Sequence, residues 1–210
     1  MERLAMAVLL LLAAIGADAN PKSNKCATLS AEWSKSWERS VPCYCGNDLL
    51  NLEVTPPRGL RVEAICGLRD TLGRWIDLAK KKASLDYYDK DGNMPYGEIY
   101  LSGQIILTGM AGMEPSDGGD LSFATKCDIP DEPAFLRNFC EFKLGSDADY
   151  KKLSGPKPAY DKEFECWSEK VKLKVIDPMV SLGETDSSGT YPRNIVVLKK
   201  TKPVFAKCYQ

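Results

Sequence analysis

The sequence of 210 residues contains no histidine. Without an imidazole, Ser-His-Asp and Cys-His catalytic arrangements are excluded. Zinc, copper and non-haem iron sites that need a histidine ligand are excluded as well. Any catalysis would have to use carboxylates, lysine, tyrosine or cysteine, so a large share of hydrolytic mechanisms is removed before any motif is considered.

A strong charge imbalance is also missing, since the formal net charge at pH 7 is −1. A near-neutral chain has no overall electrostatic attraction to nucleic acid or to an anionic membrane, so we expect neither as a partner. The lysine runs at 80–82 and 199–200 are most simply solvated surfaces. After the first residues, no apolar run approaches the roughly 18 residues of a membrane-spanning helix, so no membrane insertion is expected of the mature chain.

The longest apolar run lies at the start of the chain. Residues 4–17 carry no charge and are too few to span a bilayer as a helix. The run ends in Ala17-Asp18-Ala19, which fits the small-x-small pattern of a signal-peptidase site. We therefore expect a signal peptide over 1–19 and a secreted or periplasmic mature chain over 20–210, with an uncleaved N-terminal anchor as the alternative.

The cysteines all lie in the expected mature chain, and their even number in an exported protein predicts disulfides. Four cluster in the first third and four in the second half, so pairing within each set is the simpler arrangement. Cys43 and Cys45 share one face of an extended strand, so each is expected to pair elsewhere rather than as a redox or thiolate-metal pair. Cys127 with Cys140 would close a loop worth about 3 kcal/mol. The predicted disulfide cysteines are Cys26, Cys43, Cys45, Cys66, Cys127, Cys140, Cys166 and Cys208.

Short alternating segments separated by turns predict a mainly β protein. The clearest strand is Glu98–Thr108, in which Gly103 predicts a bulge or a bend. An exposed loop is expected over 109–120, and a strand followed by a helix over 72–88. The other expected strands are 49–54, 60–66 (forming a hairpin with 49–54), 121–127, 139–144, 165–176, 193–199 and 204–209, and the other expected helices are 30–39, capped by Ser30, and 146–153.

These elements predict a disulfide-stabilised sandwich or small barrel with two or three short helices. The mature residues are expected to form one β-rich domain, with a subdivision near 154–160 as the alternative because that segment holds two prolines.

One turn resembles an oxygen-rich calcium loop. Asp89, Asp91 and Asn93 alternate, as ligands of a hard cation would. The glycine and the last acid do not fall at the spacing of an EF-hand, and the same residues favour a plain hairpin turn for backbone reasons. Calcium is therefore one hypothesis for this turn, and otherwise no cofactor is indicated.

The aromatic residues offer a second candidate site. Trp33, Trp37, Trp75, Trp167, Tyr87, Tyr88, Tyr96 and Tyr100 are candidates for a platform that stacks a sugar or a peptide, with core packing as the favoured alternative. Trp167, beside Cys166, is expected to pack over a disulfide.

The sequence favours an exported, disulfide-bonded binding or structural protein without catalysis, whose partner is a protein or a glycan. The alternative function is a histidine-free hydrolase that acts on glycans through two carboxylates. No motif identifies the ligand, and no residue is predicted to be catalytic.

Overall fold

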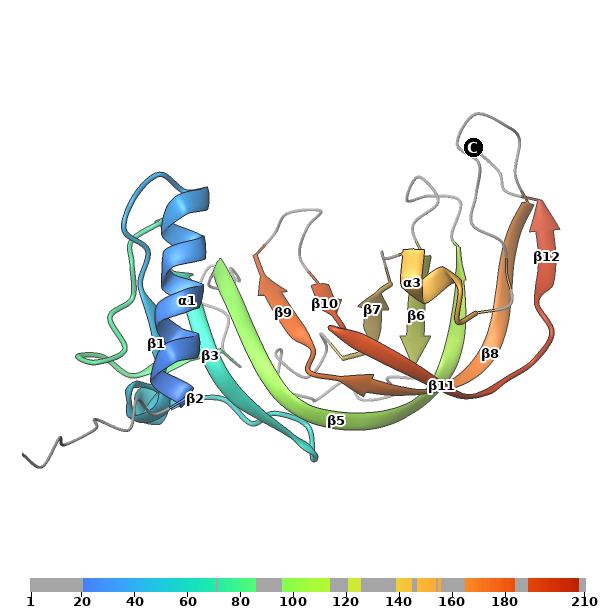
Figure 1. Ribbon diagram of the computed structural model, residues 1–210, viewed down its shortest axis with the longest axis horizontal. Helices are drawn as coiled ribbons and strands as arrows, with labels where there is room; N and C mark the ends of the chain where they lie inside the picture. Colours follow the sequence, from blue (N-terminus) through green and yellow to red (C-terminus); the bar gives the residue numbers. More distant parts are fainter. Residues whose placement is uncertain are drawn as a thin grey trace, which may run out of the picture.

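The computed structural model describes residues 21–70, 72–85, 96–113, 121–125, 139–144, 147–153, 155, 165–183 and 189–207. Within them the protein is rich in strands, which confirms the mainly β class (Figure 1). The expected signal peptide, the calcium turn, Cys127 and Cys208 lie outside the described residues, so those predictions stay predictions.

The helical elements are few. Helix α1 spans Pro21–Ser36, helix α3 spans Asp147–Tyr150, and a 3-10 helix, η1, spans Gly46–Asn51. The strands are β1 (Cys43–Cys45), β2 (Leu52–Glu53), β3 (Leu60–Arg69), β4 (Ala83–Ser84), β5 (Tyr96–Met113), β6 (Leu121–Thr125), β7 (Glu141–Lys143), β8 (Glu165–Ile176), β9 (Met179–Leu182), β10 (Gly189–Tyr191), β11 (Asn194–Lys200) and β12 (Val204–Lys207).

Strand β5 organises the sheet because it pairs along both of its edges. One edge pairs antiparallel with β3 and then with β6, and the other pairs with β9 and then with β8. Figure 1 shows β5 as one deeply curved strand that runs from the α1 end of the molecule to the β8–β12 end. The two ends of the protein are therefore joined by a single strand.

Gly103, at which the sequence predicted a bulge or a bend, lies near the middle of this curved strand. Gly103 has a φ of +119°, a conformation that residues with a side chain rarely adopt. A Cβ at this position would also collide with the carbonyl oxygen of Gly59, directly before β3. The Gly103 N–H donates to the Asp177 carboxylate at 2.8 Å, which ties the bend to the junction of β8 and β9.

Strand pairing continues in a circuit that returns to β5. β6 pairs with β5, β7 with β6, β10 runs parallel to β7, and β9 pairs with both β10 and β5. One row of register partners follows the whole circuit, and each of its side chains is fully buried. The row consists of Ala111, Phe123, Phe142, Thr190, Val180 and Ile99.

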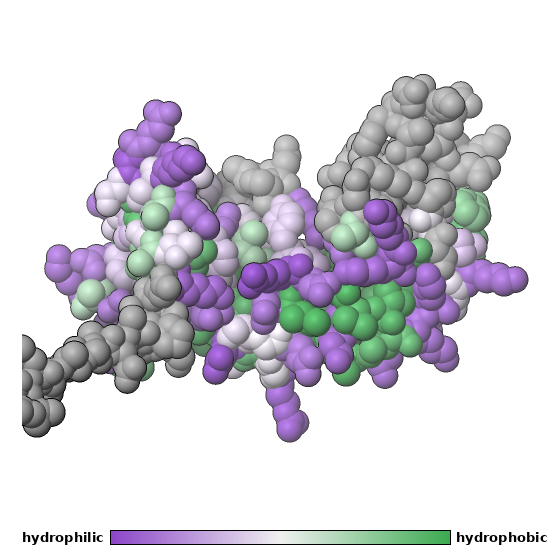
Figure 2. Space-filling model, viewed as in Figure 1, coloured by the Kyte–Doolittle hydropathy of each residue, from purple (hydrophilic) through white to green (hydrophobic). Residues whose placement is uncertain are grey.

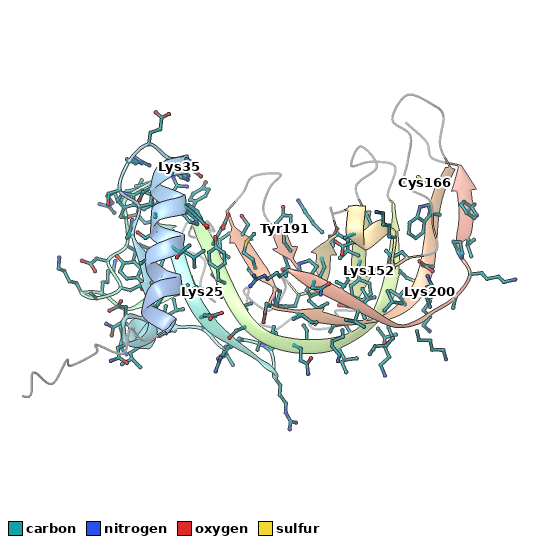
Figure 3. The ribbon with its side chains drawn as sticks, viewed as in Figure 1. Lys25, Lys35, Lys152, Cys166, Tyr191 and Lys200 are labelled. Carbon is teal, nitrogen blue, oxygen red and sulfur yellow. A yellow bond between two sulfur atoms is a disulfide. The ribbon has the colours of Figure 1, made fainter. Side chains whose placement is uncertain are left out.

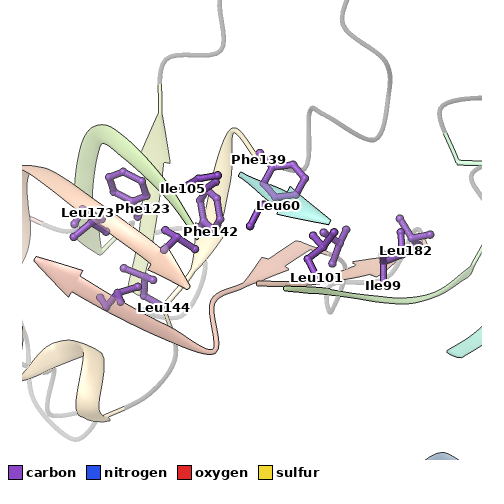
Figure 4. Packing of buried hydrophobic residues seen from close by; sticks show 14 of the residues in the cluster. Leu60, Ile99, Leu101, Ile105, Phe123, Phe139, Phe142, Leu144, Leu173 and Leu182 are labelled. Atoms are coloured by element: carbon purple, nitrogen blue, oxygen red, sulfur yellow. The ribbon is translucent and has the colours of Figure 1, made fainter. Parts of the chain in front are cut away.

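The main core packs against these strands and against their neighbours β3, β8 and β11. It contains most of the buried aliphatic and aromatic side chains, several of which are drawn in Figure 4. Trp167 belongs to it and is only 2% exposed, so it is a packing residue. A second, smaller core of Leu29, Ala64 and Cys66 lies between α1 and the β1–β3–β5 part of the sheet.

Several sequence-based predictions of local structure are wrong. Residues 49–51 belong to η1, and 52–53 form β2, which pairs in parallel with β4. The expected hairpin with 60–66 is therefore absent, because β3 pairs with β1 and β5 instead. Residues 78–85 contain turns and β4 instead of a helix. The expected loop begins late, because β5 continues through 109–113, where Gly109 and Gly112 allow close approach to β6 and β8.

Helix α1 also differs from its prediction, since it begins at Pro21 and Ser30 is an interior residue. The Ser30 hydroxyl donates to the Val41 carbonyl at 3.2 Å rather than capping the helix. The terminal strands agree better: β8 has its predicted bounds, and β11 and β12 lie within two residues of theirs.

Candidate functional site

One disulfide joins α1 to the sheet and a second joins β1 to β3 within it. Cys26 of α1 bonds to Cys45, and Cys43 bonds to Cys66 of β3, with which it is also in register. Cys43 and Cys45 therefore belong to different disulfides, as predicted. A salt bridge of 2.5 Å between Lys25 and Glu63 adds a polar contact across the same interface.

The exposed end of this interface is positioned by a short hydrogen-bond chain. The Trp33 Nε1–H donates to the Tyr100 hydroxyl at 3.0 Å, and that hydroxyl donates to the Glu98 carboxylate at 2.6 Å. Burial and the adjacent Glu98 carboxylate raise the pKa of Tyr100 above its ordinary value, so the phenol stays protonated. The Trp33 ring lies against Gly67 of β3, where a Cβ would stand 2.5 Å from the ring.

Helix α1 ends in a Schellman motif that sets the next side chains in place. The N–H of Glu38 bonds to the Lys35 carbonyl at 3.3 Å and the N–H of Arg39 to the Ser34 carbonyl at 3.1 Å. Glu38 supplies the required left-handed residue, with a φ of +52°. As a result Trp37 stacks on Trp33, with 6.2 Å between ring centroids, and Arg39 follows directly beside it.

A tight turn after β3 places Trp75. Both oxygens of the Asp70 carboxylate accept hydrogen bonds from Arg74, and one of them also accepts from the Leu72 N–H. Hydrogen bonding to the Arg74 backbone lowers the pKa of Asp70, with its ion pair to Arg74 adding to the effect. Trp75 then forms a β-bridge with Arg69, whose other neighbour is Tyr96 of β5.

These elements converge in what we call the Trp–Arg cluster, made of Trp37, Arg39, Arg69, Trp75 and Tyr96. The Arg69 guanidinium lies 4.6 Å from the centroid of Trp37, 5.5 Å from that of Trp75 and 5.4 Å from that of Tyr96. The Arg39 guanidinium lies 5.1 Å and 5.0 Å from the two tryptophans. The indoles pack edge to face at 6.3 Å.

Within the described residues, the two arginines of the cluster are held by the aromatic rings. Neither guanidinium forms a side-chain hydrogen bond or an ion pair in the described part of the chain, and the Arg69 Nε is buried without a partner. Buried donors without partners are rare in folded proteins. Stacked guanidiniums present their N–H edges in a fixed plane, which suits an anionic oxygen group.

Exposure differs across the aromatic residues proposed from sequence. Trp37 is 39% exposed, Trp33, Trp75, Tyr96 and Tyr100 are partly buried, and Tyr87 and Tyr88 lie outside the described residues. The structure thus brings five of the eight aromatics together and assigns Trp167 to the core. Sequence reasoning missed Arg39 and Arg69, and the only available signal was that each arginine lies within six residues of a tryptophan.

A cleft of about 470 Å³ lies between α1 and β9–β10, on the elements that carry Lys25 and Tyr191 in Figure 3. Glu32 and Asp177 both line it, but an Asp177 oxygen already accepts the Gly103 N–H. The two buried carboxylates of the described residues, Asp149 and Glu169, line neither this cleft nor the cavity beside Phe139.

The described cysteines of the second half are consistent with the prediction that the last four cysteines pair among themselves. Cys140 and Cys166 are disulfide-bonded, and because the first four cysteines bond to one another, neither bonds to that set. The described residues contain no group of three His, Cys, Asp or Glu side chains arranged to hold a metal. Asp89, Asp91 and Asn93, the residues of the calcium hypothesis, lie outside the described residues.

No family model, curated protein or solved structure matches the chain. No described helix has the length and apolar character needed to cross a membrane. The disulfides are compatible with an extracellular or periplasmic location, where an oxidising environment preserves them.

Proposed function

We propose that this is an exported, non-catalytic binding protein whose binding site is the Trp–Arg cluster. The observation that carries the proposal is the buried, unpartnered Nε of Arg69 inside a partly exposed set of aromatic rings. The partner is a protein that presents a carboxylate to Arg39 and Arg69 and an apolar or aromatic group to Trp37.

The composition of the cluster supports a protein partner. Tryptophan, tyrosine and arginine are the residues most enriched at the energetic centres of protein interfaces. The backbone that carries them is held by the Schellman motif and the Asp70 turn, and Trp37 stacks on Trp33, which the Tyr100 hydroxyl anchors. Binding to fixed side chains loses less conformational entropy, so the site is suited to tight binding.

The same proposal includes export directed by a signal peptide at residues 1–19. It is supported by the apolar run with its small-x-small end and by the disulfides of the described residues.

We also propose that the circuit β5–β6–β7–β10–β9 is a small barrel of the OB type. The bent first strand, the parallel β7–β10 pair and α3 between β7 and β8 support it.

Site-specific photo-crosslinking tests the binding site. A photoreactive phenylalanine analogue replaces Trp37 in one protein and Val204, which is 68% exposed on β12, in the matched control. After irradiation in the extracellular or periplasmic fraction of the source cells, the Trp37 position should give a discrete protein adduct that the Val204 position does not.

Removing the charges then tests the chemistry. R39Q in the crosslinking protein should reduce the adduct at least about fivefold, since a charge-assisted hydrogen bond contributes about 1.5 kcal/mol or more. Arg39 is exposed, so R39Q should lose only its surface cation–π contacts, about 1 kcal/mol, and the protein should remain folded. An adduct that persists in R39Q, or that survives protease but not glycosidase treatment, would rule out an acidic protein partner.

A further inference from the structure

The outer face of the sheet carries an unusual charge pattern that the near-neutral composition conceals. Lys170, Lys172 and Lys174 alternate along β8, while the residues between them, Val171 and Leu173, are buried in the core. Alternate residues of a strand project to the same side, about 7 Å apart. The three lysine side chains therefore leave the strand on one side, in a row about 13 Å long.

A fourth lysine extends this row sideways. Lys199 of β11 is the direct register partner of Lys172. Like charges placed opposite each other across a strand pair destabilise a sheet. In the described part of the chain none of these four lysines forms an ion pair, so nothing described neutralises them.

Exposed apolar side chains flank the row on both neighbouring strands. Ile106 and Met110 of β5 are register partners of Lys174 and Lys170, and they are 55% and 45% exposed. On the other side Val196, the β11 partner of Lys174, is 40% exposed. Figure 2 shows apolar side chains gathered over the β5–β11 region with hydrophilic side chains around them. We call these seven residues the lysine face.

We propose that the lysine face binds a linear sulfated polysaccharide. Regularly spaced ammonium groups in a line complement a chain that carries sulfates at regular intervals, and binding would relieve the repulsion between Lys172 and Lys199. The flanking apolar side chains contact the faces of the sugar rings. This surface lies on β5, β8 and β11, and its residues are distinct from those of the Trp–Arg cluster.

The choice of a polysaccharide over other polyanions rests on the proposed export. The strongly anionic leaflet of a cell membrane is the cytoplasmic one, which an exported protein does not meet. Outside the cell, sulfated glycans are polyanions that such a protein encounters. The binding test uses purified oxidised protein, so its outcome does not depend on whether the signal peptide is cleaved in cells or on whether the Trp–Arg cluster has a partner.

The probe is heparin. Calorimetry measures its affinity for the protein at salt concentrations between about 50 and 300 mM, a range in which affinity that depends on ionic contacts falls steeply. The variant K170Q/K172Q/K174Q should weaken binding at least about tenfold at the middle of this range and lower the slope of log affinity against log salt by about 2. The matched control K80Q/K81Q/K82Q removes the same charge from exposed residues elsewhere and should change affinity less than about twofold.

Three results would overturn the proposal: no heparin binding by the wild-type protein at the lowest salt, equal losses in the two triple variants, or tighter binding to duplex DNA or to phosphatidylserine vesicles than to heparin. Replacing lysines that repel one another should not unfold the protein. If the triple variant is nevertheless unfolded by circular dichroism, the single variants K172Q and K81Q provide the same comparison.

Discussion

The indole N–H of Trp33 donates to the Tyr100 hydroxyl at 3.0 Å and so joins α1 to the central strand β5. The two residues are 67 positions apart in the sequence, and the contact passes over Gly67 of β3. It aligns Trp33 so that Trp37 can stack on it and complete the Trp–Arg cluster. Substitutions that break the contact between α1 and β5 should therefore lower stability and disturb the Trp–Arg cluster together.

Stability at alkaline pH should depend on Tyr100. Burial, together with Glu98, raises its pKa in the folded protein above the ordinary tyrosine value of about 10. The folded state thus holds this proton more tightly than the unfolded state. The resulting stabilisation is complete below pH 10 and is lost as pH rises through the higher folded pKa.

Urea unfolding at pH 9.0 and 10.5 should show this by comparison with Y100F, taking about 10 as the unfolded pKa. At the lower pH we expect Y100F to be less stable by about 1 kcal/mol, because it loses two hydrogen bonds. At the higher pH the difference between the two proteins should shrink. A difference that grows with pH would contradict the assigned role of Tyr100 as a proton donor.

Gly67 should be more sensitive to substitution than another glycine with similar backbone geometry. Gly67 and Gly73 have φ values of +64° and +75°, so alanine at either position incurs about 1 kcal/mol of backbone strain. Only at Gly67 does the new Cβ meet the Trp33 ring. G67A should therefore be less stable than G73A by about a further 1 to 3 kcal/mol and should shift tryptophan fluorescence, as measured by denaturant titration. Equal effects would argue against tight packing of Trp33.

Glu38 offers a substitution that should stabilise the protein. It occupies the left-handed position of the Schellman motif, which glycine adopts without strain. E38G should raise stability by about 1 kcal/mol, whereas E32G, in the exposed interior of α1, should lower it by about the same amount. Thermal unfolding of both variants checks the opposite signs, and a loss of stability in E38G would contradict the helix end described here.

The two N-terminal disulfides should differ in the elements that they hold in place: Cys26–Cys45 attaches α1, whereas Cys43–Cys66 links β1 to β3. Either double variant, C26S/C45S or C43S/C66S, should lose about 3 kcal/mol in the chain-entropy model. Only the first releases α1, because β1 and β3 remain paired without their disulfide. Limited proteolysis should therefore cleave within α1 in C26S/C45S first. Equal protection of α1 in both variants would contradict this division.

Export and complete oxidation have a direct chemical check. The protein recovered from the extracellular or periplasmic fraction should begin at Asn20 by N-terminal sequencing. Thiol titration under denaturing conditions should then detect no free thiol, since all eight cysteines are predicted to be bonded. An N-terminus at Met1 would contradict signal cleavage, and more than one thiol per chain would contradict four disulfides.

Several features could be predicted from the sequence because they depend on neighbouring residues. The alternating residues of β8 gave its bounds, since side chains on a strand alternate between core and surface. Gly103 gave the bend of β5, because only glycine adopts its backbone conformation easily. The spacing of Cys43 and Cys45 was enough to predict that they pair elsewhere.

Other features depend on segments that meet only after folding. Both sides of β3 are buried, because α1 covers the side that carries Ala64 and Cys66 while Ile65 belongs to the main core. The Trp–Arg cluster combines a helix end, a turn and two strands, and nothing local in the sequence indicates that Arg39 and Arg69 approach the same indoles. Similarly, a net charge of −1 said nothing of the lysine face. Composition and spacing determined the class of protein, whereas the pairing of β5, β8 and β11 decided which charges share a surface, because charge distribution is a property of three-dimensional contacts.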